Sequence, residues 1–357
     1  MKHYFPSVTL RDIAEKSGVS ITTASRILNH RATGIPIREE TRQRVLGVAA
    51  ELGYKPNLLA RGLRGSPSSL LGVIARDIAD PFHTLLLRGV NEAAKQRSYR
   101  LFLGHVDYQP DVALAYGSMF EQSHADGIIL IGDIKGDEAA LEVLAKQHRY
   151  IVGVSDRVAR RLIPGVYADS VMGTQMALEH LWGLGHRRII CISDPRIYDE
   201  RLRVEMYRKF MREHDAADHI CVYLTTQEPQ PSFQLGMELF AGFSSAERPT
   251  AIYAASDTIA IGILQAAYQS GIKIPQHVSI VGYDNIEFTD FTIPPLTTVN
   301  QLGVEMGQTA ANLLIDMIEQ NRVSAEVDDI VISPTLVIRQ STAPPLFSVL
   351  RVVIQSS

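Results

Sequence analysis

From Leu70 onward the chain alternates between short apolar runs and amphipathic stretches, and this alternation constrains the fold more than any other feature. Amphipathic stretches with the 3.6-residue period of a helix cover 84–97, 111–122, 137–147, 172–184, 201–212, 233–240 and 257–269. Eight runs between them are nearly continuous in apolar side chains, as buried strands are: LLGVIA (70–75), RLFLG (100–104), GIILI (127–131), YIVGV (150–154), RIICIS (188–193), HICVYL (219–224), TAIYAA (250–255) and VSIVGY (278–283).

Apolar strands that alternate with crossover helices form parallel sheets that are covered on both faces. Eight strands exceed one typical sheet of this kind, and the region divides naturally near Val166. The pattern therefore predicts a doubly covered α/β body of two similar lobes. Ligands of such sheets bind beyond the carboxyl ends of the strands, so we expect the loops after the strands to line a cleft between the lobes.

The segment from Thr9 to Asn29, TLRDIAEKSGVSITTASRILN, predicts two short helices around a tight turn. Gly18 favours the break, because glycine takes positive φ without a steric penalty, and the Ser20 hydroxyl is suited to cap the second helix. Helical spacing turns Ala24, Ile27 and Leu28 inward and leaves Ile21, Thr22, Thr23, Ser25 and Arg26 outward. A second helix with a polar N-terminal face and an arginine is typical of a helix-turn-helix that enters a DNA major groove.

Charge is distributed unevenly along the chain. The net charge is −4, but residues 1–65 hold 11 Lys and Arg against 5 Asp and Glu, a net charge of +6 that leaves −10 for the remainder. A basic head on an acidic body is the electrostatic pattern of a DNA-binding module attached to a domain that does not bind DNA.

The head continues beyond the two short helices. A third helix is expected from Glu39 to Leu52, with Val45, Val48 and Ala49 in its buried stripe. The sequence GYKPNLLARGLRGSPSS follows at 53–69, where Leu58 to Leu63 are long enough for one or two helical turns. Nearby glycines and Pro67 weaken that helix in isolation, so this segment is interpreted as a linker that folds only when something holds it.

Several classes of protein are not favoured. No secretory signal or membrane-length apolar run is found, and Cys191 and Cys221 lie in strand-like runs, so we expect free core thiols in a reducing cytoplasm. Catalytic motifs, cofactor motifs and metal-ligand spacings were also sought without success, so neither an enzyme nor a metal or cofactor is expected. His180 and His186 are interpreted as capping and packing residues.

Taken in order, the helix-turn-helix and seven later motifs resemble the LacI/GalR family of bacterial transcriptional regulators, over about Val8 to Ser341. The later motifs are GYKPNLLARGLR, LGVIARDIADPF, ADGIIL, HLWGLGHRRI, PTAIYAASDTIAIGIL, VSIVGYDN and PPLTTVNQ. The resemblance implies a homodimer, or a dimer of dimers, that binds a palindromic operator. It also implies a body like a periplasmic sugar-binding protein, whose small-molecule effector alters operator affinity and whose usual action is repression.

With this resemblance the chain divides into four parts. We expect a helix-turn-helix head at 1–56, a hinge helix and linker at 57–69, a two-lobed effector-binding and dimerisation body at 70–345, and a tail at 346–357. Lobe 1 is expected to comprise about 70–166 plus 295–325, and lobe 2 about 167–294 plus 326–345.

For DNA, the resemblance assigns base contacts to Ile21, Thr22 and Arg26. Arg26 is the strongest candidate, because a guanidinium donates two hydrogen bonds to a guanine edge. Residues expected to anchor phosphates without reading sequence are Thr9, Thr23, Ser25 and Asn29. In the linker, Leu63 matches the leucine that intercalates in the minor groove, with Arg61 close to phosphates.

For the effector, the resemblance assigns Arg203 in RLRVEMYRKF and Asp284 in VGYDN to the cleft. A carboxylate that accepts from vicinal hydroxyls and a guanidinium that donates in a fixed fork suit a sugar or polyol. The other candidate cleft residues are Arg76, Asp77, Phe82, Asp169 and Ser256.

Departures from the family pattern cluster around this cleft. Ser256 stands where asparagine is common, Met206 replaces a usual glycine, and His83 takes a position often filled by an aromatic residue; in the head, Arg38 replaces a capping serine. A sugar or sugar derivative is the expected effector, and a nucleoside, a purine or a protein partner stays open. A transport solute-binding protein is the remaining alternative, disfavoured by the basic head and the missing signal sequence.

Overall fold

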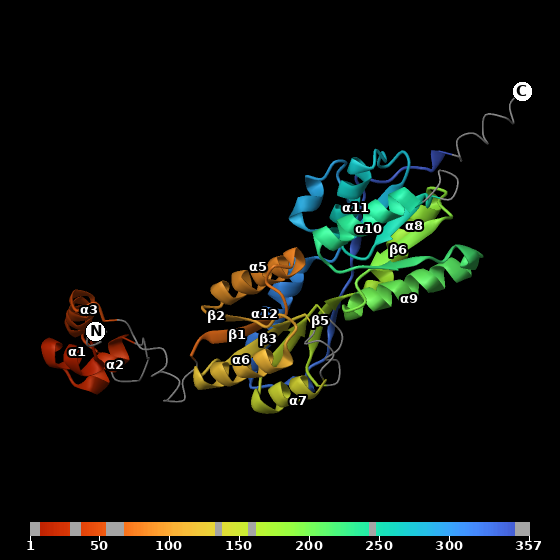
Figure 1. Ribbon diagram of the computed structural model, residues 1–357. Helices are drawn as coiled ribbons and strands as arrows, with labels where there is room; N and C mark the ends of the chain where they lie inside the picture. Colours follow the sequence, from red (N-terminus) through yellow and green to blue (C-terminus); the bar gives the residue numbers. More distant parts are fainter. Residues whose placement is uncertain are drawn as a thin grey trace, which may run out of the picture. The chain divides into compact units, whose positions relative to one another are not determined.

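The computed structural model describes residues 8–28, 37–54, 68–132, 138–155, 162–242 and 248–346. The chain forms two compact units, Met1–Ser68 and Ser69–Ser357 (Figure 1). Asn29, Arg61 and Leu63, most of the expected hinge, and the tail beyond residue 346 lie outside the described residues.

The first unit is the three-helix head that the sequence predicts, with α1 at Leu10–Ser17, α2 at Ile21–Leu28 and α3 at Glu39–Glu51. A capping box starts α1, because the Thr9 N–H donates to the Asp12 carboxylate at 2.7 Å and the Asp12 N–H donates back to the Thr9 hydroxyl oxygen at 3.4 Å. Gly18 ends α1 in the left-handed region at φ 63°. Ser20 caps α2 by accepting from the Thr23 N–H at 3.1 Å, as predicted.

The three helices bury a small apolar core formed by Ile13, Ala14, Ala24, Ile27, Val45 and Ala49. The start of α3 is held less firmly, because the Arg38 side chain at its N-cap makes no capping hydrogen bond.

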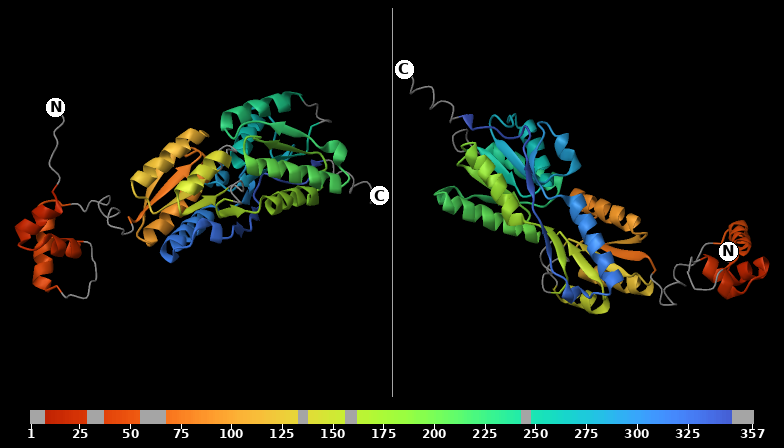
Figure 2. Two further views of the ribbon diagram at one scale, coloured as in Figure 1. Left: turned by 90° about the horizontal axis from the view of Figure 1, so that it is seen from below. Right: turned by 180° about the vertical axis from the view of Figure 1, so that it is seen from behind.

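The second unit contains two six-stranded sheets, each flanked by helices (Figures 1 and 2). In the first sheet all neighbouring strands are parallel, in the order β11-β5-β4-β3-β1-β2. Its strands are β1 Leu70–Ala75, β2 Arg100–His105, β3 Gly127–Ile131, β4 Ile151–Val154, β5 Gly165–Ala168 and β11 Ile330–Ile332. The helices of this lobe are α5 Pro81–Gln96, α6 Pro110–Gln122, α7 Glu138–Gln147 and α12 Gly303–Gln320.

The second sheet has the order β12-β10-β9-β8-β6-β7, and only the β10–β12 pair is antiparallel. Its strands are β6 Ile189–Ser193, β7 Val222–Leu224, β8 Ala251–Ala254, β9 Ser279–Asp284, β10 Thr297–Asn300 and β12 Thr335–Val337. Its helices are α8 Ser170–Gly183, α9 Tyr198–Glu213, α10 Pro229–Gly242 and α11 Asp257–Gln269. The predicted two-lobed parallel-sheet body is confirmed.

The chain passes between the lobes after β5, after β10 and after β11. The expected lobe boundaries are therefore wrong at the second and third passages. β10 was expected in lobe 1, but it pairs with β9 of the second sheet; β11 was expected in lobe 2, but it pairs with β5 of the first. Each of these strands has at most three apolar residues in succession, so its own pattern does not predict a strand or its sheet.

Close helix packing holds the first lobe together on one face of its sheet, where α5 and α12 lie side by side (Figure 2). Glycines allow this approach: a Cβ on Gly89 would overlap the backbone carbonyl of Val304, and one on Gly307 would overlap that of Leu86. The helices then bury Leu86, Val90, Met306 and Ala310 in the core of the lobe.

The segment after β12 is fastened to the second lobe through buried polar groups. Ser341 Oγ accepts from the Thr297 N–H at 2.8 Å and donates to the Ile280 carbonyl at 2.6 Å. His186 contacts the Ala343 carbonyl at 2.9 Å, and its burial lowers its pKa to about 4. This histidine is thus a packing residue of the second lobe.

Cys191 and Cys221 are both free thiols, the first fully buried in β6. Among the described residues, no helix is both long and apolar enough to cross a membrane.

Adding a methyl group at the contact between α5 and α12 should destabilise the body. We expect Gly307→Ala to lower the free energy of unfolding by about 1–3 kcal/mol, because the new Cβ forces two helix backbones apart. Gly183→Ala is the matched control, because a Cβ there meets no atom within 4 Å; its effect should stay within about 0.5 kcal/mol. Urea unfolding measures both, and equal effects would contradict this packing.

Candidate functional site

A small, partly open cavity lies between the two lobes, where loops after the parallel strands meet. It has a volume of about 20 Å³, enough for about one water molecule. Lobe 1 contributes Arg76, Asp80, Phe82, His83 and Ser155; lobe 2 contributes Ile197, Asp199, Arg203, Gln227 and Asp284; Gln301 lies on the second passage between them.

Arg203 is placed by the second turn of α9 and is buried. Its guanidinium donates to the Ala255 carbonyl at 2.6 Å and lies 3.7 Å from the centre of the Tyr283 ring. Its Nη1 is 3.9 Å from Asp284 Oδ1, whereas its buried Nε has no hydrogen-bond partner among the described residues. A ligand oxygen could therefore satisfy a donor that the protein leaves open.

Asp284 is the last residue of β9 and has φ 118°, which is unusual for a residue with a side chain. Gln301 donates to its Oδ1 at 2.6 Å. Burial raises the pKa of Asp284 well above the usual range of an aspartate, although Arg203 opposes the shift. A strained backbone that directs a buried carboxyl group into a cavity is typical of functional sites.

The lobe 1 wall is built by the turn from β1 into α5. Asp80 caps α5 by accepting from the Phe82 N–H at 2.9 Å, and Arg76 lies 3.6 Å from its second oxygen. His83 contacts the Asp77 carbonyl through Nδ1 (2.8 Å) and Arg76 Nη2 through Nε2 (3.1 Å). Because arginine only donates, His83 Nε2 is the acceptor in the contact with Arg76.

Behind the cavity, Asp194 organises the loops that follow β6 and β7. It is fully buried, accepts from the Arg196 guanidinium (2.6 Å to Nη2) and from the Gln227 N–H (2.9 Å), and its own N–H donates to Glu200 at 2.6 Å. Burial raises the pKa of Glu200 to about 7, although Arg203 and the Asp194 N–H oppose the shift.

The structure brings together four of the seven residues expected in the cleft: Arg76, Phe82, Arg203 and Asp284. The other three do not line this cavity. Asp77 accepts from the Ala79 N–H at 2.8 Å, Asp169 caps α8 through the N–H groups of Val171 and Met172, and Ser256 caps α11.

Sequence reasoning missed Asp80, Ser155, Ile197, Asp199, Gln227 and Gln301 as cavity residues, and it noted His83 only as a departure. One signal was available. Ser155, Gln227 and Gln301 follow the carboxyl ends of β4, β7 and β10 within three residues, as the rule for parallel sheets predicts.

In the head, the N-terminal part of α2 faces solvent. Ile21 is 42% exposed and Thr22 is exposed, whereas Thr23, Ser25 and Arg26 are half-buried. Ala24 and Ile27, on the opposite face, are buried in the core. The Thr9 hydroxyl, expected at a phosphate, donates to Asp12 in the capping box.

Two family models match this chain. The model of the bacterial regulatory proteins of the lacI family matches residues 9–57, and the model of the periplasmic binding protein-like domain matches residues 178–342. The HTH-type transcriptional regulator DegA of Bacillus subtilis (strain 168) is 34% identical over 344 residues, which is 94% of this chain and 98% of DegA. The HTH-type transcriptional repressor CytR of Escherichia coli (strain K12) is 29% identical over 89% of this chain and 92% of its own.

Solved structures of related regulators also superpose on this chain. The lac repressor dimer bound to operator and the anti-inducer ONPF superposes with a TM-score of 0.83 at 26% identity, over 94% of this chain and 99% of that chain. A LacI family transcriptional regulator from Enterococcus faecium with bound ribose gives a TM-score of 0.69 at 26% identity, over 77% and 99%.

The buried carboxyl group of Glu200 should make stability depend on pH. Its folded pKa of about 7 exceeds the value of 4.5 for an unperturbed glutamate. The stabilising contribution of the protonated form is therefore full below about pH 4.5 and is lost as the pH rises through 7. Glu200→Gln removes this loss, so its free energy of unfolding relative to wild type should rise by on the order of 3 kcal/mol between pH 4.5 and 8.

Urea unfolding at both pH values measures the difference. Glu205→Gln, an exposed change on the same helix, is the control and should show no such rise. A difference between Glu200→Gln and wild type that is independent of pH would disprove the shifted pKa.

Proposed function

Because the chain belongs to the lacI family of bacterial regulatory proteins, we propose that it is a transcriptional repressor whose operator affinity is set by a small effector. The observation that carries this proposal is the pairing of a helix-turn-helix head with a two-lobed body that buries an arginine and an aspartate between its lobes. The related lac repressor was crystallised as a dimer on operator DNA.

In this proposal α2 enters the major groove and its exposed N-terminal face meets the bases. Ile21, Thr22 and Arg26 read base edges, and Thr9, Thr23 and Ser25 fix the register on phosphates. Two heads then occupy the half-sites of a pseudo-palindrome, about one helical turn apart.

The proposed effector is a sugar or sugar derivative in the cavity between the lobes. Arg203, Asp284 and Gln301 offer donors and acceptors that suit vicinal hydroxyls, and Phe82 supplies an apolar aromatic face. Charged and amide side chains dominate the lining, which favours a sugar ring over a nucleobase. The relative from Enterococcus faecium was solved with ribose.

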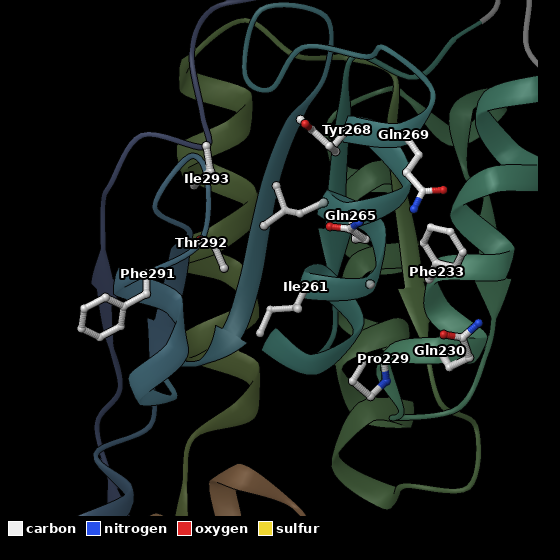
Figure 3. Close-up of a pocket in the computed structure, with 12 residues that line it drawn as sticks. Pro229, Gln230, Phe233, Ile261, Gln265, Tyr268, Gln269, Phe291, Thr292 and Ile293 are labelled. Carbon is white, nitrogen blue, oxygen red and sulfur yellow. The ribbon is translucent and has the colours of Figure 1, made fainter.

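We propose that two copies associate through an apolar groove on lobe 2 (Figure 3). Figure 3 shows Ile261, Gln265 and Tyr268 along α11, with Phe233 of α10 on one side and Phe291–Ile293 on the other. The groove has a volume of about 660 Å³. Tyr268, Phe291 and Ile293 are 79%, 82% and 92% exposed, which is costly for large apolar side chains unless a partner covers them.

The relatives are transcriptional regulators, and we propose that this protein likewise acts by binding alone, without catalysis, in the cytoplasm. Loss or gain of operator occupancy is then its only output.

Arg26→Ala tests the DNA assignment. If Arg26 reads a guanine, the variant should lose about 1–3 kcal/mol of discrimination at one base pair of each half-site, while affinity for other sequences changes little. Arg44→Ala, an exposed arginine on α3, is the control and should leave discrimination unchanged. Binding to a library of half-site variants at fixed salt measures both. An equal loss on every sequence would make Arg26 a phosphate contact.

Arg203→Ala tests the effector assignment. The thermal unfolding of the protein is measured in the presence of each of a set of compounds: glucose, galactose, ribose, fructose, their phosphates, adenosine and hypoxanthine. A ligand at 100 times its dissociation constant should stabilise the wild type by about 2.7 kcal/mol. Arg203→Ala should abolish that shift and keep operator binding, whereas Arg212→Ala, an exposed change on the same helix, should keep both. A normal shift in Arg203→Ala would exclude this site.

A further inference from the structure

One aromatic ring joins the two lobes beside the cavity. Tyr108 belongs to lobe 1, in the loop between β2 and α6, and its ring centre lies 5.6 Å from the guanidinium of Arg196, in the loop after β6 of lobe 2. The guanidinium of Arg76, which lines the cavity, lies 5.4 Å from the same ring centre. Tyr108 therefore contacts one cation from each lobe.

Arg196 is fixed in place by the carboxylate of Asp194. Its Nε and Nη2 donate to both oxygens of the fully buried Asp194, at 2.6 to 3.1 Å, and its own N–H donates to the same carboxylate at 2.9 Å. Its side chain nevertheless stays 43% exposed. A bidentate pair fixes the plane of the guanidinium, so Arg196 offers a preoriented face to Tyr108 and pays little ordering entropy for the contact.

The loop that carries Tyr108 is strained. Asp107 and Tyr108 have φ of 45° and 58°, two consecutive left-handed residues that both have side chains. The Gln109 N–H closes the turn on the Val106 carbonyl at 2.9 Å. This costly backbone directs the ring toward Arg196, and strain of this kind persists where the surrounding structure gains from it.

The cavity behind this contact is too small for a sugar. At about 20 Å³ it holds about one water molecule, so a ligand that uses Arg203 and Asp284 must enter when the lobes are farther apart. We call this narrow arrangement of the lobes the closed form, and the contact between Tyr108 and Arg196 is made in it.

We propose that Tyr108 and Arg196 are positioning residues for the effector, which hold the two lobes closed by a contact across the cleft. This inference rests on the proposed function in naming the cleft an effector site, but closure itself needs neither DNA nor effector. Opening breaks the contact with Arg196, and closing restores it. Arg76 contacts the Tyr108 ring and also lines the cavity. Making or breaking the contact between Tyr108 and Arg196 is therefore linked to the lobe 1 wall of the cavity.

A second contact between the lobes, an ion pair, serves as the control. Arg88 of α5 donates to Glu287 at 2.9 Å, but these side chains are 57% and 70% exposed. Exposed pairs of this kind contribute little, so its removal should leave closure nearly unchanged.

Closure can be measured as a distance in the full chain without ligand. Spin labels are placed at Ala115→Cys on α6 and Glu205→Cys on α9, two exposed positions on the helices that follow the two loops, after Cys221→Ser. Cys191 is fully buried and stays unlabelled. Labelled subunits are diluted into unlabelled protein, and pulsed dipolar spectroscopy then gives the distribution of distances between the lobes.

In the wild type we expect one dominant short distance. Tyr108→Ala and Arg196→Ala should each move population to longer distances, by about two- to fivefold in the ratio of open to closed forms. Combining them should add little to either alone. Tyr108→Phe keeps the ring and should match the wild type, as should Arg88→Ala.

Unchanged distributions in Tyr108→Ala and Arg196→Ala would overturn the inference, and so would a shift in Tyr108→Phe as large as that in Tyr108→Ala. Failure of the effector panel with normal closure would contradict the proposed function and leave this inference standing.

Discussion

The architecture of the body depends on the three passages of the chain between the lobes. Each sheet takes strands from separated parts of the sequence, so each lobe is completed only when the chain has returned to it. α12 comes from the second passage and packs on α5 through glycine contacts, which makes lobe 1 depend on residues more than two hundred positions apart. Each lobe is therefore built from separated segments, and the three passages are the covalent connections between them.

Buried charged groups gather at the boundary between the lobes. Exclusion of water from this boundary explains their protonation. Arg203 keeps its charge among Asp284, Asp199 and the Tyr283 ring, whereas burial raises the pKa of Glu200 and Asp284. Buried ionisable groups of this kind seldom add stability compared with apolar packing. The ligand binding proposed above accounts for their presence between the lobes.

The sequence predicted the architecture well where periodicity is strong. All eight long apolar runs contain strands, and the head was predicted down to the Gly18 turn and the Ser20 cap. It failed for β5, β10, β11 and β12, where the sequence has at most three apolar residues in succession. In the cavity, Arg203 and Asp284 were predicted from a motif, but Asp169 and Ser256 are helix caps. Both roles use a short polar side chain after a strand, so the local sequence does not distinguish them.

The passages also connect directly to the groups that a ligand would meet. Gln301, on the second passage, donates to Asp284 at 2.6 Å, and the next residue, Leu302, is left-handed at φ 61°. The Asp169 N–H, on the first passage, donates to the Ile332 carbonyl of the third at 3.0 Å. A ligand that competes for the Asp284 carboxyl group therefore acts on a residue already bonded to a passage. One hydrogen bond thus joins the proposed binding group to a connection between the lobes.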